Sequence, residues 1–223
     1  SASLLGLSVV VTGVASPVGD RIARGLATAG ATVTGCFRGR SSSIDVLGEV
    51  PGLTLMQGNL LDVGFTQALP PMDAVVHCAA KTDSAPVSTM LESNVLATQR
   101  LADRAIQLGC RTWIQMSTIS VHGLVMREII DRSTDFINLS TYGETKRLAE
   151  RLLEDRSRDL GVISLRLPAV LVPGAKNHWP ARTLALAQSN HPITIHNANS
   201  LFNGVVHIDD LSLFISKLLS DEV

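Results

Sequence analysis

Tyr142 and Lys146 have the chemistry and the spacing needed to move a proton. They are four positions apart in residues 141–160, a segment with helical periodicity, so their side chains lie on one face of a helix. A phenol with its ordinary pKa of about 10 is a poor base at neutral pH, but a neighbouring ammonium stabilises the phenolate and lowers that pKa. We therefore predict that Tyr142, the only tyrosine, is an acid/base group assisted by Lys146. The alternative is an amphipathic helix in which the tyrosine packs and the lysine is solvated.

A hydroxyl group is expected beside this pair. The apolar residues 112–116 predict a strand, and Ser117-Thr118-Ile119-Ser120 follow it. Functional residues of open α/β folds gather at the carboxyl ends of strands. We predict that Thr118, with Ser117 as second choice, donates a hydrogen bond to a carbonyl or alcohol oxygen. The alternative is turn chemistry, in which these hydroxyls cap backbone groups.

A glycine-containing turn near the start of the chain predicts a phosphate site. It joins an apolar run to a helical pattern with the sequence Thr12-Gly13-Val14-Ala15-Ser16-Pro17-Val18-Gly19. Backbone N–H groups and the helix N-terminus of such a turn can face a pyrophosphate. Gly13 permits the tight turn, Gly19 permits close packing of helix on strand, and Pro17 suits the first helical turn. Ser16 stands where glycine is usual. It can cap the helix and donate to a phosphate, although its Cβ narrows the approach.

The end of the second strand bears on which dinucleotide binds. An acidic residue there would accept hydrogen bonds from the adenosine ribose and repel a 2′-phosphate. The sequence is Cys36-Phe37-Arg38-Gly39-Arg40, without an acid. Arg38 and Arg40 could instead pair with a 2′-phosphate, which favours NADP over NAD. The alternative is that both are solvated, or that Arg38 stacks on adenine.

The elements that must position these residues alternate along the chain. Strands are expected at residues 7–12, 31–37, 53–57, 74–78, 112–116 and 162–167, and helices at 17–29, 87–108 and 141–160. Apolar runs without polar alternation predict strands buried on both faces, as in a parallel sheet covered by helices on both sides. Six β/α units predict a doubly wound parallel α/β sheet.

The pattern changes after Pro168, where Pro, Asn and His become frequent. A helix at 182–189, strands at 193–196 and 205–208, and a helix at 211–219 are expected. We predict a dinucleotide-binding domain at residues 1–168. Residues 169–223 would form a small substrate-binding region interleaved with the last elements of that domain.

Composition excludes several classes of function. The chain has 223 residues, a formal net charge of −1 and 45% hydrophobic residues, so a nucleic-acid partner is not expected. We expect no membrane span and no signal peptide. The three cysteines form no C-x-x-C pair and fit small buried side chains in a reducing cytoplasm. The six histidines show no metal-ligand spacing, so no metal is expected.

Eight motifs in register resemble those of the extended short-chain dehydrogenase/reductase family, the NAD(P)-dependent epimerase/dehydratase group. The family's T-G-x-x-G-x-x-G corresponds to residues 12–19, its acid–apolar–x–acid segment to 59–62, its H-x-A-A to 77–80, its N-V-x-G-T to 94–98, its S-S/T-x-x-V-Y-G to 117–123, its Y-x-x-x-K to 142–146, its R-x-P to 166–168 and its H-V-x-D to 207–210. Three positions depart from the pattern. Ser16 replaces a glycine, Asn59 stands where an adenine-contacting Asp is usual, and His122 replaces a common Tyr.

The resemblance implies a Rossmann fold and hydride transfer at a sugar or alcohol carbon. Tyr142 would move the hydroxyl proton, Thr118 would orient the oxygen, and Lys146 would also hold the nicotinamide ribose. Cofactor contacts are expected from Gly13, Ser16, Pro17, Val18, Gly19, Arg38, Asn59, Leu60, Cys78, Ala79, Ala80, Lys81, Asn94, Met116, Tyr142, Lys146, Leu167, Pro168 and Val170. Substrate contacts are expected from Thr82, Thr118, His122, Asn177 and Arg182.

The substrate is open at this point. Relatives that act on nucleotide-diphosphate sugars usually have a cation just before the H-V-x-D strand, where this chain has Asn203; Arg182 is the alternative cation. No Asp-Glu pair follows Thr118, which argues against dehydration and leaves epimerisation or simple oxidation and reduction. The alternatives are an NADPH-dependent reductase of small ketones, aldehydes or lactones, and a non-catalytic dinucleotide sensor. Relatives often form homodimers through two long helices, here residues 87–108 and 141–160.

Overall fold

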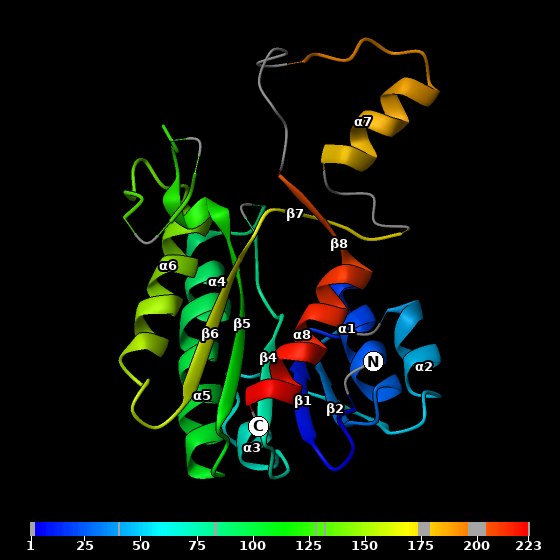
Figure 1. Cartoon of the computed structure of the whole chain (residues 1–223), viewed down its shortest axis with the longest axis vertical. Coiled ribbons are helices and arrows are strands. Elements are labelled where there is room, and N and C mark those ends of the chain that lie inside the picture. The colour runs from blue at the N-terminus through cyan, green and yellow to red at the C-terminus, as the bar shows by residue number, and fades with distance from the viewer. Residues whose placement is uncertain are drawn as a thin grey trace.

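The structure is a computed structural model that describes residues 3–39, 41–82, 84–127, 129–131, 133–173, 179–195 and 204–222. Figure 1 shows a sheet flanked by helices, with a smaller region above the carboxyl ends of the strands. The predicted positions Arg40, Asn177 and Asn203 lie outside the described residues.

Six parallel strands form the central sheet in the order β3-β2-β1-β4-β5-β6. Their bounds are β1 Ser8–Thr12, β2 Thr32–Phe37, β3 Leu53–Gln57, β4 Ala74–His77, β5 Thr112–Thr118 and β6 Gly161–Leu167. The order reverses between β1 and β4, which is the point where open α/β sheets form a crevice at their carboxyl ends. The predicted doubly wound parallel sheet is confirmed.

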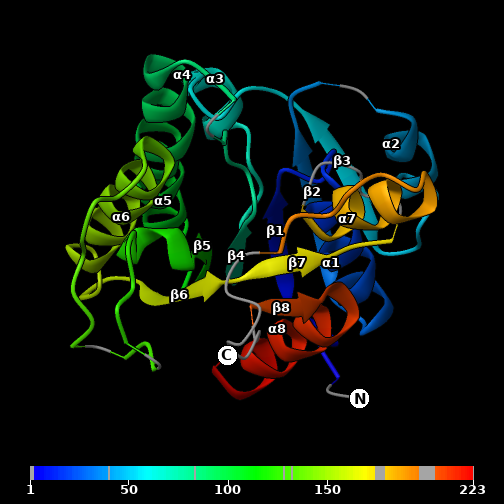
Figure 2. The ribbon, with the colours of Figure 1, turned by 90° about the horizontal axis from the view of Figure 1, so that it is seen from above.

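Helices cover both faces of this sheet (Figure 2). On one face lie α1 (Pro17–Thr28), α2 (Ser42–Leu47) and α8 (Ile208–Glu222), and on the other α5 (Ala97–Gln107) and α6 (Thr141–Glu154). Successive residues of a strand contribute to the hydrophobic cores on opposite faces of the sheet. Val9 and Val11 pack with α1 and α8, whereas Val10 packs on the α5 side. Both faces are therefore apolar, which explains why the strand segments show no polar alternation.

The helix expected at residues 87–108 is interrupted. It consists of α4 (Val87–Leu91), the π-helical turn η1 (Glu92–Leu96) and α5. Asn94 sits in the π turn with only 1% of its surface exposed. A π turn widens the backbone locally and is often found at functional sites. The sequence pattern of apolar positions did not reveal it.

Other boundaries also differ from expectation. Helix α6 ends at Glu154 instead of Leu160, since residues 155–160 form turns that return buried Leu160 to the core. The short helices α2 and α3 (Val63–Gln67) and the 3₁₀ turn η2 (Ile119–His122) were not predicted. Each is about one turn long, too short to show a periodic apolar face.

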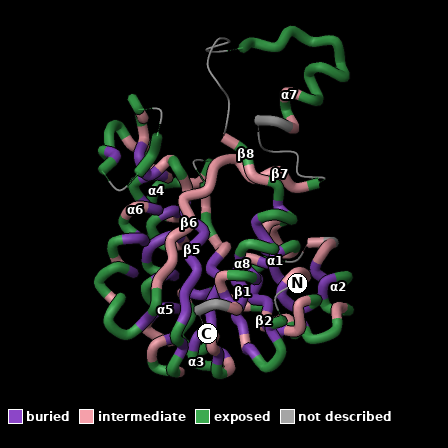
Figure 3. Tube along the Cα trace, viewed as in Figure 1, coloured by how far each residue is buried: buried purple, intermediate pink, exposed green. Residues whose placement is uncertain are grey.

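The C-terminal region contains a two-stranded parallel sheet and two helices. Strand β7 (Ala169–Leu171) pairs with β8 (Val205–His207), and α7 (Trp179–Gln188) stands apart above them (Figure 1). The strand predicted at 193–196 is wrong for residues 193–195, which have no regular structure. Figure 3 shows that α7 and the segment after it are largely exposed, whereas β1, β4 and β5 of the sheet below are mostly buried. Helix α8 instead packs on α1 and completes the core of the sheet.

Candidate active site

A cleft of about 400 Å³ opens at the carboxyl ends of β1, β2 and β4. This size lies within the range of small-molecule sites. Its walls contain nine of the predicted cofactor residues: Gly13, Ser16, Arg38, Asn59, Leu60, Cys78, Ala79, Ala80 and Lys81. The cleft also contacts Thr12, Ala15, Cys36, Phe37, Gly39, Gly58, Ser93 and Ala97, which the sequence argument did not single out.

The turn after β1 has the geometry of a phosphate loop. Gly13 has a φ of +72°, and a Cβ there would lie 2.8 Å from the backbone nitrogen of Ala79. A Cβ on Gly19 would overlap the carbonyl of Gly13. Both glycines are therefore needed sterically, as expected. The Ser16 hydroxyl accepts from the N–H of Gly19, as predicted for a helix cap, and donates to the Gly13 carbonyl at 2.8 Å.

The outer end of the cleft combines one cation with one amide. Arg38 is exposed after the end of β2 and lines the cleft, and its backbone carbonyl accepts from the Gln57 side chain. Asn59 Oδ1 accepts a hydrogen bond from the N–H of Leu61, which restrains the loop after β3. Cys36 and Cys78 also line the cleft, where burial raises the pKa of both thiols to about 12. They are therefore apolar wall groups rather than nucleophiles at neutral pH.

Tyr142 and Lys146 lie one turn apart at the start of α6, which Ser140 caps by accepting from the N–H of Gly143. Tyr142 is partly buried, and Lys146 is 1% exposed. Burial lowers the pKa of the Lys146 ammonium to about 8, and the nearby Glu150 carboxylate acts in the opposite direction. Lys146 is thus still mostly charged at neutral pH, which is the state that stabilises a phenolate.

The end of β5 meets the first turn of α6. Thr118 caps η2: its hydroxyl accepts from the N–H of Ser120 and donates to the Ser120 hydroxyl at 3.1 Å. A Cβ on Gly143 would overlap the Ser120 carbonyl, so only glycine allows this approach. The structure therefore brings Thr118 and the turn that contains Tyr142 to the same edge of the sheet. It also places Thr118 in the turn chemistry that was the alternative interpretation of this hydroxyl.

Asn94 connects the wall of the cleft to helix α6 by hydrogen bonds. Its Oδ1 accepts from the N–H of Lys81, and its Nδ2 donates to the Lys81 carbonyl and to Thr145 Oγ1. Thr145 in turn donates to the carbonyl of Tyr142. Asn94 therefore holds the segment after β4 and the first turn of α6 in one fixed relation.

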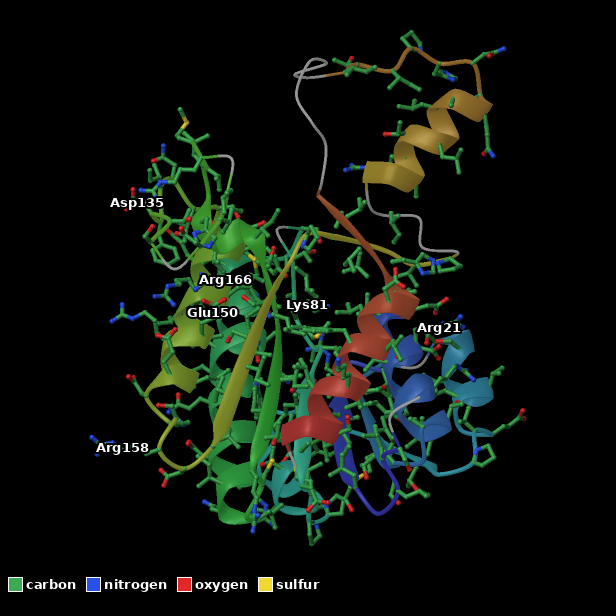
Figure 4. The ribbon with its side chains drawn as sticks, in the orientation of Figure 1. Arg21, Lys81, Asp135, Glu150, Arg158 and Arg166 are labelled. Carbon is green, nitrogen blue, oxygen red and sulfur yellow. The ribbon has the colours of Figure 1, made fainter. Side chains whose placement is uncertain are left out.

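A buried charge cluster lies behind this edge. The Glu150 carboxylate, 1% exposed, accepts from Arg166, Arg147 and the Ser117 hydroxyl. Figure 4 shows Glu150 and Arg166 side by side below the loop that contains Asp135. Burial alone would raise the Glu150 pKa, but its hydrogen bonds to Arg166 and Ser117 and the two arginine charges hold that pKa below its ordinary value.

The structure turns His122 into this cluster instead of toward a substrate. Its side chain is fully buried, Nε2 faces Arg166 at 3.1 Å, and Nδ1 faces the Asp135 carbonyl. The ring also stacks on Phe136 with centroids 5.0 Å apart. The predicted substrate contact of His122 is therefore not what this geometry supports, because both ring nitrogens already face protein groups.

The remaining predicted residues lie around this centre. Pro17 and Val18 open α1, Leu167 ends β6, Pro168 follows it and Val170 lies in β7, the last three partly buried. Met116 belongs to the core on the α8 side. Thr82 is exposed after β4, and Arg182 is exposed on α7. These positions are compatible with the predicted contacts, which stay predictions.

Several residues that build the site were missed by the sequence argument. Gly143 and Glu150 are part of the helix already singled out, and a glycine directly after Tyr142 was a signal of close packing. Thr145 and Ser120 gave no local signal, since Asn94, which bonds Thr145, is 51 positions away and the bond of Ser120 to Thr118 depends on the 3₁₀ turn.

Comparison with known proteins decides the family. The sequence matches the model of the NAD dependent epimerase/dehydratase family over residues 9–222. The chain belongs to this family. The predicted relationship to extended short-chain dehydrogenases/reductases is thereby confirmed, and the chain is a member of a family of NAD-dependent enzymes.

The individual proteins that this chain is similar to differ in what they act on. Mus musculus L-xylulose reductase is 27% identical over 194 residues, which cover 79% of this chain and 77% of that protein. Vibrio cholerae UDP-glucose 4-epimerase is 24% identical over 215 residues, covering 92% of this chain and 64% of that protein. The structure of MoeE5 in complex with UDP-glucose and NAD superposes with a TM-score of 0.79 at 26% identity, over 96% of this chain and 72% of that one.

Within the part of the chain that the structure describes, no helix has the length and apolar character to cross a bilayer. No three His, Cys, Asp or Glu side chains there converge on a position that could hold a metal ion.

Proposed function

We propose that this family member transfers a hydride between a nicotinamide dinucleotide and a carbinol or carbonyl carbon. The observation that supports this most directly is the close packing of Gly143, next to Tyr142, on the Ser120 carbonyl of the turn that Thr118 caps, with Lys146 one turn further along α6. The glycine-loop cleft opens at the same carboxyl edge of the sheet. The fit of the cofactor rests on the turn that Gly13 and Gly19 shape, where a Cβ would clash with the backbone of Ala79 or of Gly13 and so change the loop that would face a pyrophosphate.

The residues of the chain have distinct tasks in this proposal. Tyr142 exchanges the proton of the reacting hydroxyl, and Lys146, charged at neutral pH, stabilises its phenolate. Thr118 exchanges its bond to Ser120 for one to the substrate oxygen and so orients that oxygen. The bound nicotinamide would supply the hydride acceptor or donor. Gly13, Ser16, Arg38, Asn59 and the segment 78–81 would hold the adenosine diphosphate half.

We propose a nucleotide sugar as the substrate and epimerisation as the overall reaction. Support comes from the UDP-glucose 4-epimerase relative and from MoeE5, whose structure holds UDP-glucose. A second function, NADPH-dependent reduction of a small carbonyl compound, is favoured by the similarity to L-xylulose reductase. Residues 169–223 would supply substrate contacts, except for α8, which serves the core.

Three finer points belong to the same proposal. Exposed Arg38 at the end of β2, with no acidic residue beside it, favours NADP over NAD. Exposed Leu91 and Leu96 on one long helix and Leu148 on α6 would form the core of a four-helix homodimer contact. Three free cysteines with raised thiol pKa values suit a reducing compartment, the cytoplasm.

The test combines binding with turnover. UDP-, GDP- and dTDP-sugars would be screened by thermal shift in the presence of NAD and NADP, and hits would be assayed for epimerisation and for reduced nicotinamide. Tyr142→Phe is the matched variant because it keeps the ring and removes the proton. A shift with a sugar nucleotide and turnover lost in Tyr142→Phe would support the proposal. A protein that binds neither dinucleotide, or turnover that survives in Tyr142→Phe, would overturn it.

A further inference from the structure

His77 lies at the centre of a buried hydrogen-bond chain between the phosphate loop and α6. Its Nδ1 is 2.8 Å from Thr12 Oγ1, and its Nε2 is 3.0 Å from Thr98 Oγ1. Thr12 is the last residue of β1, directly before Gly13, and Thr98 lies in α5. His77, Thr12 and Thr98 are each at most 1% exposed, so water does not compete for these bonds.

The position of every proton in this chain follows from its neighbours. Burial lowers the pKa of His77 to about 3, so the ring is neutral and has one N–H. Thr98 donates its only hydroxyl proton to the carbonyl of Asn94, so it must accept from His77, which puts the ring proton on Nε2. The bare Nδ1 must then accept from Thr12, whose oxygen accepts in turn from the N–H of Ala79.

The series of hydrogen bonds continues from Asn94 to helix α6. The Asn94 backbone receives the Thr98 proton, and its side chain clamps Lys81 and donates to Thr145, which donates to the Tyr142 carbonyl. Ala79 and Lys81, both held by this chain, line the cleft. Successive hydrogen bonds are therefore donated in the same direction, from Ala79 in the cleft wall through His77 to the turn of α6 that contains Tyr142.

We propose that His77 is a positioning residue that sets the phosphate loop and the first turn of α6 in a fixed relation, so that a dinucleotide held by the loop is presented to Tyr142 and Lys146. Only a residue with an acceptor on one side and a donor on the other completes the chain. An apolar residue would leave the Thr12 hydroxyl without an acceptor and Thr98 without a donor, in a site that water does not reach. This inference rests on the proposed dinucleotide chemistry.

The experiment compares three variants. His77→Gln can accept from Thr12 and donate to Thr98, whereas His77→Leu can do neither. Trp113→Phe is the matched control: Trp113 contacts the His77 ring at 5.3 Å and donates to Gln115, but it is not part of the chain. For each variant we would measure unfolding in urea, dinucleotide affinity by fluorescence, and kcat.

We expect His77→Leu to lose about tenfold in dinucleotide affinity and about tenfold in kcat, equal to about 1.4 kcal/mol each. His77→Gln should stay within about threefold of the native chain in both. Trp113→Phe should lose stability without losing affinity or kcat. Equal affinity and kcat in His77→Leu and Trp113→Phe would overturn the proposal, because a purely structural role would affect both variants through the folded fraction alone.

Two readouts do not depend on turnover. Nitrogen NMR of the native chain should show the His77 proton on Nε2, and a proton on Nδ1 would overturn the inference. Hydrogen exchange at the Lys81 amide, which is bonded to Asn94, should speed up in His77→Leu and not in Trp113→Phe. If the native chain binds no dinucleotide, the proposed function fails, while these readouts still report whether His77 connects the two segments.

Discussion

Gly143 touches the carbonyl group of Ser120 so closely that no side chain fits between them. The contact joins the first turn of α6 to the 3₁₀ turn that follows β5. Tyr142 is the residue before this glycine, and Thr118 caps the turn that contains Ser120. The distance between the proposed acid/base group and the proposed orienting hydroxyl is therefore fixed by a backbone contact. Side chains alone do not set it.

Gly143→Ala should separate this contact. The added methyl group overlaps backbone atoms that cannot rotate away, so α6 must shift by a few tenths of an ångström or more. We expect kcat to fall by about 100-fold, since small misplacement of reacting groups has effects of this size. Dinucleotide affinity should stay within about threefold because the phosphate loop is remote. The control is Gly64→Ala in α3, whose Cβ would approach only the Asp62 carboxylate, at 3.3 Å, and no backbone atom. An active Gly143→Ala enzyme would contradict this role.

The buried ammonium of Lys146 should make stability depend on pH in the alkaline range. Its pKa is about 8 in the folded chain, lowered from the ordinary 10.5 by burial. The unfolded chain therefore binds more protons between these values, so the free energy of unfolding contributed by this group rises as pH increases from about 8 to about 10.5. Urea unfolding across that range should show the rise in the native chain and not in Lys146→Met, with a slope difference of up to about 1.4 kcal/mol per pH unit. Parallel plots of the free energy of unfolding against pH for the two proteins would contradict this prediction.

Glu150 should contribute more to stability than its surface counterparts. Glu150→Gln removes the charge that Arg166 and Arg147 share, in a position where the carboxylate is 1% exposed. Breaking a buried pair in this way costs about 3 kcal/mol or more. The matched change is Asp103→Asn, which removes the carboxylate paired with Arg156 but is 47% exposed, and should cost about 1 kcal/mol or less. Equal losses in the free energy of unfolding, measured in urea for the two variants, would show that the buried cluster contributes no more to stability than the exposed pair.

The sequence was sufficient for local features and insufficient for contacts between distant segments. The turn at Gly13, the capping by Ser16 and the alternation of strands and helices follow from residue types and apolar runs close together in the chain. The π turn around Asn94 does not, and the bonds that Asn94 makes there go to Lys81 and Thr145, 13 and 51 positions away in the sequence. The same holds for His122. Family resemblance placed it near the substrate, but Arg166 and Phe136, which come from other segments, draw its ring into the interior.

Arg38 provides the last prediction, which concerns the choice of dinucleotide. Arg38 lines the cleft, and within the described residues no carboxylate forms a salt bridge with it. Hydrogen bonds from a guanidinium group to a 2′-phosphate contribute about 1.5 to 3 kcal/mol. Arg38→Ala should therefore weaken NADPH binding by about tenfold or more and change NADH binding by less than about threefold, as measured by nicotinamide fluorescence. Arg158→Ala, an exposed arginine at the opposite end of the molecule (Figure 4), should change neither. Tighter binding of NADH than NADPH by the native chain would show instead that Arg38 is only a solvated charge, and the proposed preference for NADP would be wrong.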